Sequence, residues 1–290
     1  MTGTFHQAIF AMCLCASSAL ASIVDAQALE GQPNFRDLGG YETTEGLQIQ
    51  EGMVFRSGEL PRTTDNDLAT LERLGVRTVV NFLTDGEIEY RGADRLPEGV
   101  REINLPITGD VNGIPDAANK LVEARKTGDF RSFPPEFNPL VHEELVSGTA
   151  DAQYAELFKI LSDESNYPVV FHCSHGIHRT GTAAALVLSA LGVPWHTVRE
   201  DYLLSNDYRA EEVAPRIVEL NNLAKEIDMS ADERNANAEA IGAFYLLEPE
   251  YIDASREAAE ARFGSVDNYI RQGLKQSEAE LESMRSILLK

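Results

Sequence analysis

The segment Phe171–Gly181, with the sequence FHCSHGIHRTG, constrains the fold of this 290-residue chain more than any other stretch. It follows the apolar run 168–171 and leads into 180–192, a segment rich in Ala and Leu that ends at a glycine. The β-branched run predicts a buried strand, and the small-residue segment predicts a helix. The chain therefore passes from strand to helix through a short loop, which contains one cysteine, two histidines and one arginine.

Strands and helices are predicted to alternate along the rest of the N-terminal half. Apolar runs predict strands at 77–83 and 101–107, and periodic apolar positions predict helices at 64–75 and 151–163. Strands separated by helices favour an α/β fold with a mostly parallel sheet flanked by helices. Because such sheets bind ligands at the carboxyl ends of their strands, we expect the cysteine-containing loop to lie at the ligand site.

Three other regions have a different character. Residues 33–60 are rich in Gly and polar turn formers, and we expect turns and a hairpin there. Residues 108–150 combine Pro and aromatic residues with one helical stretch, 117–126, and we interpret them as a helical insertion or lid over the site. From Trp195 onward the pattern is almost wholly helical, so we expect a helical C-terminus.

The first 26 residues have the composition of a secretory signal peptide. The stretch 9–21 is apolar and ends in small residues, although no Lys or Arg precedes it. We therefore predict a signal peptide at 1–26, a single domain at 27–290 and a periplasmic or secreted protein. An apolar stretch of about 13 residues is too short to span a bilayer, so no stable membrane insertion is expected.

The charge balance excludes one class of partner. The chain carries a net charge of −22, from 25 Lys and Arg against 47 Asp and Glu. Such a body repels nucleic acid and anionic lipid headgroups over its general surface, so neither is expected to bind. The positively chargeable side chains of the loop are therefore an exception within an acidic chain.

The loop has the length and composition of an anion-binding nest. Its candidate substrate-binding residues are Ser174, His175, Gly176 and Ile177. Their backbone N–H groups can turn inward around a tetrahedral oxyanion, and the helix N-terminus adds its positive end. Gly176 lies in mid-loop, where a tight turn needs a residue without Cβ. Arg179 can hold two phosphate oxygens at once.

Cys173 would be the single cysteine of an exported chain, because Cys13 and Cys15 lie in the predicted signal peptide. A thiol at a helix N-terminus beside cations has a pKa well below the ordinary value of ~8.5. Cys173 is thus a candidate nucleophile that attacks phosphorus and forms a phosphocysteine, which water hydrolyses in a second step. Thr180 can donate a hydrogen bond to the departing sulfur, and we count it with Cys173 and Arg179 as a catalytic residue.

Several motifs resemble a known family. The string HCxxGxxRTG at 172–181 resembles the signature of cysteine-dependent protein tyrosine and dual-specificity phosphatases. NFRDLGGY at 34–41 and FRSG at 55–58 are similar to a bacterial tyrosine phosphatase family that includes secreted mycobacterial and listerial phosphatases. DYLLSN at 201–206 and the tail 248–274 resemble the same family. The likeness extends over nearly all of the predicted mature chain.

The resemblance implies a cysteine-phosphatase-like α/β domain with extra helices, which uses neither a metal nor another cofactor. It implies a protein-tyrosine phosphatase that acts on phosphotyrosine and sometimes on phosphoinositides, with a phosphorylated protein or small phosphoester as its partner. Asp37 and Arg36, in the NFRD motif, are expected either to support the loop or to form a turn and a surface ion pair, and we favour a structural role near the site. We also count Asp37 among the substrate-binding residues. His172 is expected to support the thiolate through hydrogen bonds to the loop backbone.

Two adjacent residues depart from the family pattern. Ile177 and His178 stand where many members have Lys and Asp. The lysine is associated with multiply phosphorylated substrates and the aspartate with proton donation. Ile177 and the acidic body therefore favour phosphotyrosine or small phosphoesters, with a dual-specificity or inositol-phosphate phosphatase as the alternative. We assign proton donation to His178, with Asp110 and then Asp116 as alternatives.

Three other functions are compatible with a loop of this composition. The cysteine and the histidines at 175 and 178 are ligands that zinc accepts, although a cation site leaves Arg179 unexplained. A phosphate-binding module without turnover would use the same nest to bind phosphorylated partners. A sulfur-transfer domain of rhodanese type would also carry a loop cysteine, but the Arg-Thr-Gly ending argues against it.

Overall fold

A five-stranded sheet forms the centre of this computed structural model, which describes residues 29–290 except 112–113 and 135. The predicted signal peptide at 1–26 lies outside the described residues. The strands are β1 Arg36–Asp37, β2 Val54–Ser57, β3 Thr78–Asn81, β4 Arg101–Asn104 and β5 Val169–His172. In the order β1-β2-β5-β3-β4, β1 runs antiparallel to β2 and the other neighbours are parallel. The predicted α/β fold with a mostly parallel sheet is therefore confirmed.

Strand β5 lies in the middle of the sheet and leads directly into the loop. Its last residue, His172, is in register with Ser57 of β2 and with Asn81 of β3. All four residues of β2, of β3 and of β5 are buried, as expected for strands that are covered on both faces. The loop after His172 therefore starts at the carboxyl edge of the sheet, between two other strand ends.

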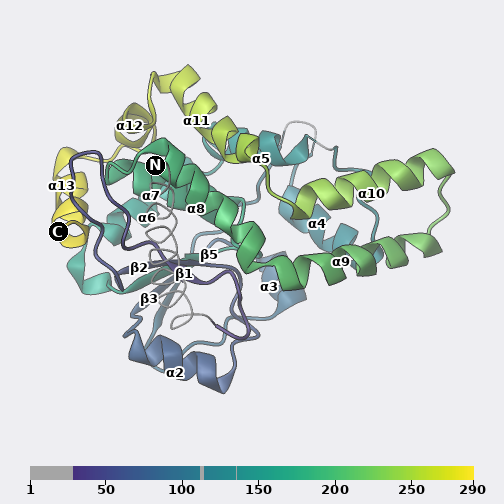
Figure 1. Ribbon diagram of the computed structural model, residues 1–290, viewed down its shortest axis with the longest axis horizontal. Helices are drawn as coiled ribbons and strands as arrows, with labels where there is room; N and C mark the ends of the chain where they lie inside the picture. The colour runs from purple at the N-terminus through teal and green to yellow at the C-terminus, as the bar shows by residue number, and fades with distance from the viewer. Residues whose placement is uncertain (1–28, 112–113, 135) are drawn as a thin grey trace, which may run out of the picture.

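Helices cover both faces of the sheet, and the side chains of each strand alternate between them. Phe171 of β5 belongs to the larger hydrophobic core, while its neighbour Val170 belongs to a smaller one. Helix α2 (Asp65–Arg73) closes the smaller core. Helices α7 (Arg179–Ala190) and α8 (Trp195–Tyr208) lie on the opposite face, as Figure 1 shows.

The other helices surround this central part. They are α3 Asp85–Arg91, α4 Ala117–Thr127, α5 Phe137–Leu145, α6 Asp151–Leu161, α9 Ala210–Leu223, α10 Ala231–Tyr245, α11 Pro249–Phe263, α12 Val266–Asn268 and α13 Glu278–Leu288. Helices α4 and α5 form the predicted helical insertion, and the predicted helical C-terminus begins at α8. Helices α9 and α10 pack together and project from the body (Figure 1).

Helix α3 was not expected from the sequence. Its N-terminus has a capping box, in which the side chains of Thr84 and Glu87 each accept from the other's backbone N–H. The motif TDGE, from Thr84 to Glu87, was the available signal, but only seven helical residues follow Thr84 and no apolar period develops. This short helix positions Glu87, which the active site uses.

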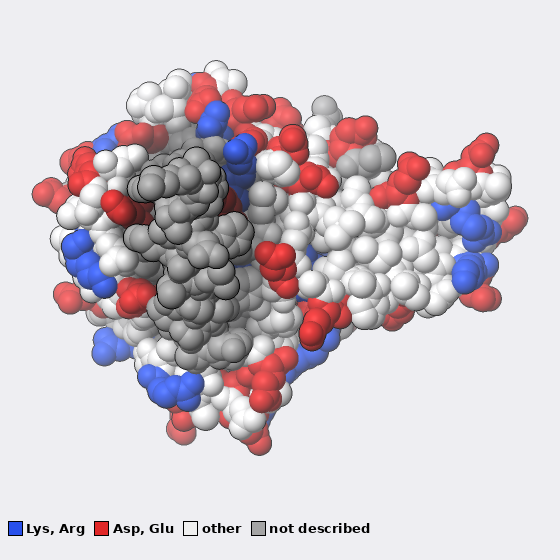
Figure 2. All heavy atoms as spheres, in the orientation of Figure 1, with Lys and Arg blue, Asp and Glu red and all other residues white. Residues whose placement is uncertain are grey.

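The surface agrees with the acidic composition. On the face that Figure 2 shows, Asp and Glu side chains are spread widely, with Lys and Arg scattered among them. Within the described part of the chain, every helix is too short or too polar to cross a lipid bilayer.

Candidate active site

The loop between β5 and α7 turns sharply at Gly176. Its backbone has a φ of 71°, in the left-handed region that favours glycine. A Cβ added there would lie 2.7 Å from both Asn34 Nδ2 and the carbonyl oxygen of Ser57. The structure therefore needs glycine at this position for two reasons, backbone conformation and lack of space.

Two side chains hold the carbonyl groups of the loop. Asn34 Nδ2 donates to the carbonyl of His175 at 2.8 Å, and Arg56 donates through one terminal nitrogen to the carbonyl of Gly176 at 2.7 Å. In a trans peptide the carbonyl and the N–H point in opposite directions. The N–H groups of Gly176 and Ile177 therefore point away from Asn34 and Arg56, as an anion-binding nest requires.

A buried ion cluster fixes these two side chains. Asp201 of α8 accepts from Arg36 Nε at 3.1 Å, from the hydroxyl of Tyr41 at 3.1 Å and from Arg56. Arg36 in turn donates to Asn34 Oδ1 at 2.6 Å. Burial raises the pKa of Asp201, but the two arginines outweigh burial and hold it below its ordinary value. Sequence reasoning offered Arg36 as a support of the loop, but it did not predict that Arg36 and Arg56 share the carboxylate of Asp201 beneath it.

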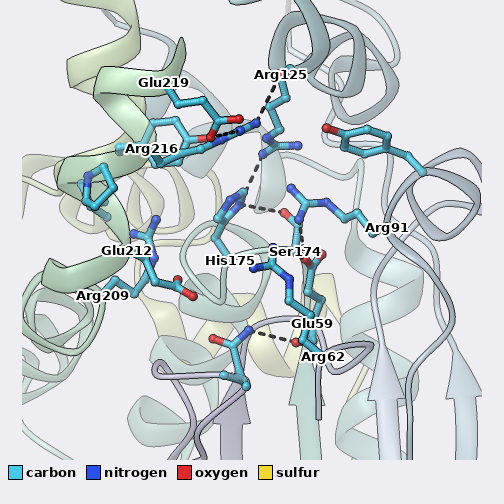
Figure 3. Close-up of a pocket in the computed structure, with 16 residues that line it drawn as sticks. Glu59, Arg62, Arg91, Arg125, Ser174, His175, Arg209, Glu212, Arg216 and Glu219 are labelled. Carbon is cyan, nitrogen blue, oxygen red and sulfur yellow. Dashed lines mark hydrogen bonds and ion pairs between the residues drawn. The ribbon is translucent and has the colours of Figure 1, made fainter. Parts of the chain in front are cut away.

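Asp37 contacts the backbone of two turns near β1. Its carboxylate accepts from the backbone N–H of Gly39 at 2.7 Å and of Gly52 at 2.6 Å. Two cavities lie beside the loop, one in front of Cys173 and one next to Ser174 and His175 (Figure 3). Asp37 is not among the described residues that line them. Asp37 therefore orders the turns around β1, as its alternative role as a turn residue implies, and its role in substrate binding stays a prediction.

Cys173 is almost completely buried at the N-terminus of α7, with 2% of its surface exposed. Burial raises the pKa of its thiol, whereas the charge of Arg179 and the neighbouring hydroxyl and N–H of Thr180 lower it. The net direction is downward, so the thiolate is favoured. The positive end of the helix acts in the same sense.

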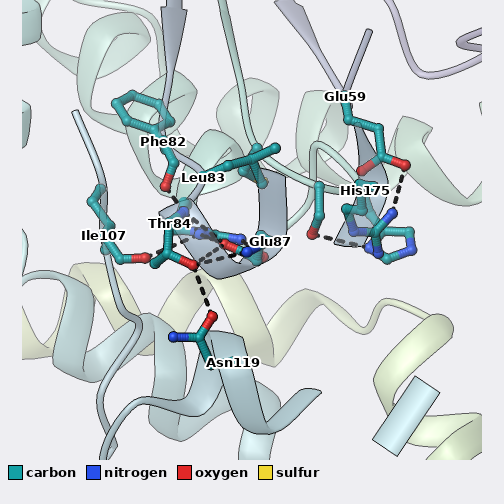
Figure 4. A network of polar contacts seen from close by, with 12 residues as sticks. Glu59, Phe82, Leu83, Thr84, Glu87, Ile107, Asn119 and His175 are labelled. Atoms are coloured by element: carbon teal, nitrogen blue, oxygen red, sulfur yellow. Dashed lines mark hydrogen bonds and ion pairs between the residues drawn. The ribbon is translucent and has the colours of Figure 1, made fainter. Parts of the chain in front are cut away.

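Contacts with Glu87 and with two backbone carbonyls fix the position of the Arg179 side chain. Its terminal nitrogens contact the two carboxylate oxygens of Glu87 at 2.7 Å each, and one of them donates to the carbonyls of Phe82 and Ile107 at 3.0 Å. Burial opposes ionisation of Glu87, but Arg179 lowers its pKa to about 2. Figure 4 shows Glu87 within a polar network that includes Thr84 and Asn119, whose side chains are hydrogen bonded at 3.0 Å. Nothing in the sequence singled out Glu87.

His172 forms a second buried ion pair next to the sulfur. Its Nε2 lies 2.6 Å from Asp94 Oδ2, and neither side chain is exposed. Burial lowers the pKa of His172, but Asp94 outweighs burial and the net shift is upward. Nδ1 faces the carbonyl oxygen of Cys173 at 3.4 Å, which agrees with the predicted contact to loop backbone.

The two loop histidines, His175 and His178, both have pKa values well below the ordinary value. His178 Nε2 lies 2.6 Å from Asn138 Oδ1, and the amide nitrogen of Asn138 donates to the carbonyl of Ala243. The amide oxygen therefore faces His178, so Nε2 carries the hydrogen. Burial, with His142 and Arg179 nearby, lowers the pKa of His178 well below its ordinary value. A neutral imidazole already bonded to an amide oxygen is poorly suited to the proton donation that we expected of His178.

His175 lies on the other side of the loop. Its Nδ1 is 3.2 Å from the hydroxyl of Ser174 and 3.3 Å from a terminal nitrogen of Arg125. Burial and the surrounding arginines lower the pKa of His175 well below its ordinary value. Within the described part of the chain, no three Cys, His, Asp or Glu side chains converge in a way that could hold a metal ion. The zinc-binding alternative therefore has no geometric support.

The space in front of Cys173 is small. A cavity of about 30 Å³ is lined by Cys173, Ile177 and Arg179 from the loop, by residues of α4 and α5, and by Phe244 of α10. Because a single water needs about 10–15 Å³, this cavity holds roughly two waters and no phosphoester. We call α4, α5 and Phe244 the cover of the site. This cover must therefore move before a substrate reaches the sulfur. The lid expected between 108 and 150 accounts for α4 and α5 only, since α10 was not part of it.

Comparisons with known proteins found relatives in sequence and in structure. A sequence profile described as "Tyrosine phosphatase family" matches residues 27–290. The triple specificity protein phosphatase PtpB of Mycobacterium tuberculosis is 29% identical over 300 positions, covering 90% of this chain and 98% of PtpB. A putative tyrosine-protein phosphatase of Cupriavidus necator is 28% identical over 280 positions, covering 93% of this chain and 94% of the relative. Among solved structures, P. aeruginosa TpbA aligns with a TM-score of 0.33 at 21% identity, covering 62% of this chain and 89% of TpbA.

Truncating the aromatic side chain of the cover should expose the thiol. Phe244→Ala removes a ring that packs on His178, at a centroid distance of 5.4 Å. Loss of a buried aromatic ring costs the closed state several kcal/mol, so we expect alkylation of Cys173 by iodoacetamide to accelerate by at least about tenfold. Phe263→Ala, which removes a ring that packs on Tyr269, is the matched control. Equal alkylation rates in wild type and both variants would contradict the claim that Phe244 covers the thiol.

Removing the charge beneath the loop should destabilise the fold. Asp201→Asn leaves Arg36 and Arg56 buried without their carboxylate, and we expect a loss of about 3–5 kcal/mol in the free energy of unfolding. The measurement is urea unfolding at neutral pH. Glu156→Gln, which breaks an exposed pair with Lys159, should cost less than about 1 kcal/mol. A similar loss in both variants would show that the cluster has no special role.

Proposed function

The chain belongs to the tyrosine phosphatase family, and we propose that it hydrolyses phosphate monoesters, above all phosphotyrosine, through a phosphocysteine at Cys173. The observation that carries the proposal is the environment of that sulfur. A buried thiol with a lowered pKa lies at a helix N-terminus, beside a fixed arginine and a loop whose amides face inward. A merely structural cysteine would need none of these features.

The reaction follows from the groups around the sulfur. The thiolate of Cys173 attacks phosphorus, an S–P bond forms, and the ester P–O bond breaks as the alcohol oxygen leaves with a proton. Inward-facing amides and Arg179 stabilise the charge that develops on the phosphoryl oxygens. In the second step water attacks phosphorus and gives a proton to the group that protonated the alcohol, the S–P bond breaks and inorganic phosphate leaves. Thr180 donates a hydrogen bond to the sulfur, which departs as thiolate.

Asp110 is the proton donor that the geometry supports best. Thr108 and Gly109 line the cavity in front of Cys173, and Asp110 follows them directly. Its Oδ1 accepts from the backbone N–H of Asp116 at 2.6 Å, while the carboxylate of Asp116 is occupied by the side chain of Asn119. Asp110 and His178 are both half-buried, but Nε2 of His178 already lies 2.6 Å from the amide oxygen of Asn138.

The N-terminal segment supports export of this phosphatase to the periplasm or the medium. The apolar stretch of this segment ends in small residues. Removal of the whole segment leaves a mature chain in which Cys173 has no thiol partner. Phosphorylated proteins or small phosphoesters outside the cytoplasm would then be its substrates. N-terminal sequencing of the purified native protein tests this, because retention of Met1 would exclude a cleaved signal peptide.

Rapid mixing with p-nitrophenyl phosphate tests the chemistry. We expect turnover that survives EDTA, stops after alkylation by iodoacetamide and falls by at least about 10³-fold in Cys173→Ser. Mass spectrometry of acid-quenched enzyme should detect one added phosphoryl group on the peptide that contains Cys173. Full activity in Cys173→Ser would contradict the mechanism, and tight vanadate binding without turnover would indicate a binding module instead.

A leaving-group comparison identifies the proton donor. Asp110→Asn should lower kcat for phenyl phosphate by about 10²–10⁴-fold, because phenolate needs a proton as it leaves. The loss should be much smaller with p-nitrophenyl phosphate, whose leaving group needs no proton. His178→Asn and Asp116→Asn serve as the matched controls. If His178→Asn shows this dependence on the leaving group and Asp110→Asn does not, the assignment is wrong.

A further inference from the structure

The carboxylate of Asp94 lies at the carboxyl edge of the sheet, next to the start of the loop. Asp94 belongs to the irregular segment 92–100, which connects α3 to β4. Its side chain has no exposed surface. A carboxylate is seldom buried completely unless it is paired, and the reaction described above makes no use of this one. The contacts of Asp94 therefore call for an explanation.

The ends of three parallel strands meet at this carboxylate. Oδ2 lies 2.6 Å from Nε2 of His172, the last residue of β5, and accepts at 3.2 Å from the side-chain amide of Asn81, the last residue of β3. Oδ1 accepts at 3.0 Å from the backbone N–H of Leu60, which follows β2. One buried acid thus connects β2, β3 and β5 at the edge where the loop begins.

The contacts of His172 favour a hydrogen on both ring nitrogens. Nε2 faces the carboxylate of Asp94, and Nδ1 faces the carbonyl oxygen of Cys173 at 3.4 Å. Carboxylate and carbonyl oxygens only accept hydrogen bonds, and a neutral imidazole carries hydrogen on one nitrogen. Burial lowers the pKa of His172, but Asp94 outweighs burial, in agreement with these contacts. The ring is therefore a cation, directly before the nucleophile in the chain.

The same carboxylate also acts on the loop backbone. Leu60 follows Glu59, whose N–H donates to the carbonyl of Ser174 at 3.2 Å. Glu59 and Ser174 both border the cavity shown in Figure 3. By holding the N–H of Leu60, Asp94 fixes the turn that orients this carbonyl. Asp94 thus has contacts that lead to the residue before Cys173 and to the residue after it.

A cation next to a thiol favours the thiolate, whereas a buried neutral imidazole does not. We propose that Asp94 is a positioning residue of the reaction, which keeps His172 doubly protonated and thereby favours the ionised form of Cys173. This role rests on the proposed function, because it concerns the nucleophile of the same reaction. The carboxylate lies on the far side of the imidazole ring from the Cys173 backbone, so the cation is the nearer of the two charges.

Other ionisable groups are also within electrostatic reach of the sulfur. Arg179 of α7 and Glu87 of α3 form an ion pair, Tyr154 lies in α6, and Arg209 lies between α8 and α9. All of them are retained when Asp94 is substituted. A change in the titration of the thiol in such a variant therefore reports on the pair of Asp94 and the imidazole.

Thiolate absorbance against pH tests the proposal without requiring turnover. Asp94→Asn keeps the size of the side chain and one acceptor oxygen, but it lacks the charge that holds the imidazolium. We expect the midpoint of the thiol titration, corrected with Cys173→Ser, to rise by about 0.5–1 pH unit. Glu102→Gln is the matched control, because Glu102 accepts from the same Asn81 amide at 3.2 Å but is exposed on β4. It should leave the midpoint unchanged.

The pH dependence of p-nitrophenyl phosphate hydrolysis separates this role from a merely structural one. Below the wild-type midpoint, kcat/KM of Asp94→Asn should be about 3–10-fold lower than that of wild type, because less thiolate is present. Above both midpoints it should equal or exceed the wild-type value, since the nucleophilicity of a thiolate rises with its pKa. A loss of the same size at every pH would indicate a damaged fold and overturn the proposal.

A double variant shows whether Asp94 acts through the imidazole. His172→Gln removes the cation while its amide can still donate to the carboxylate, so it should raise the midpoint by itself. In that background Asp94→Asn should not raise the midpoint further, and a second rise of equal size would overturn the proposal. If Asp94→Asn does not fold, His172→Gln alone decides, because an unchanged midpoint would show that no cation at this position acts on the sulfur.

The outcomes for the two proposals are distinct. If wild type hydrolyses p-nitrophenyl phosphate and Asp94→Asn has the wild-type midpoint, the phosphatase activity stands and the role of Asp94 is wrong. If the midpoint moves as expected but wild type shows no hydrolysis, the effect of Asp94 on the sulfur stands and the proposed function fails.

Discussion

The buried carboxylate of Asp201 is the contact on which the rest of the site depends. It binds Arg36 and Arg56, which in turn fix Asn34 and the loop carbonyls of residues 175 and 176. Once those carbonyls point outward, the amides must point inward, because the peptide is planar. A single acid on α8 therefore sets the direction of the amides that would receive a phosphoryl group.

The charged side chains next to the sulfur form two ion pairs. Glu87 holds Arg179 and Asp94 holds His172, so each cation keeps its charge and its position without any ligand. The sulfur lies among these pairs, and fixed dipoles favour its ionised form. Because all the groups are set before substrate arrives, little reorganisation is needed in the transition state.

Local features were predictable from the sequence, and long-range ones were not. The strand, the loop and the helix around Cys173 follow from contiguous residues, as does the glycine at 176. Glu87 was missed because it lies on a short helix without apolar period, 92 residues from the arginine that it binds. The cover by α10 depends on packing between distant segments.

A titration of the Cys173 thiol tests the central claim most directly. The absorbance of the thiolate, taken as the difference between wild type and Cys173→Ser, can be followed against pH. The account predicts a midpoint below the ordinary thiol value of about 8.5, and a higher midpoint in Thr180→Val, which lacks the hydroxyl hydrogen bond. A wild-type midpoint at or above that value, unaffected by Thr180→Val, would contradict it.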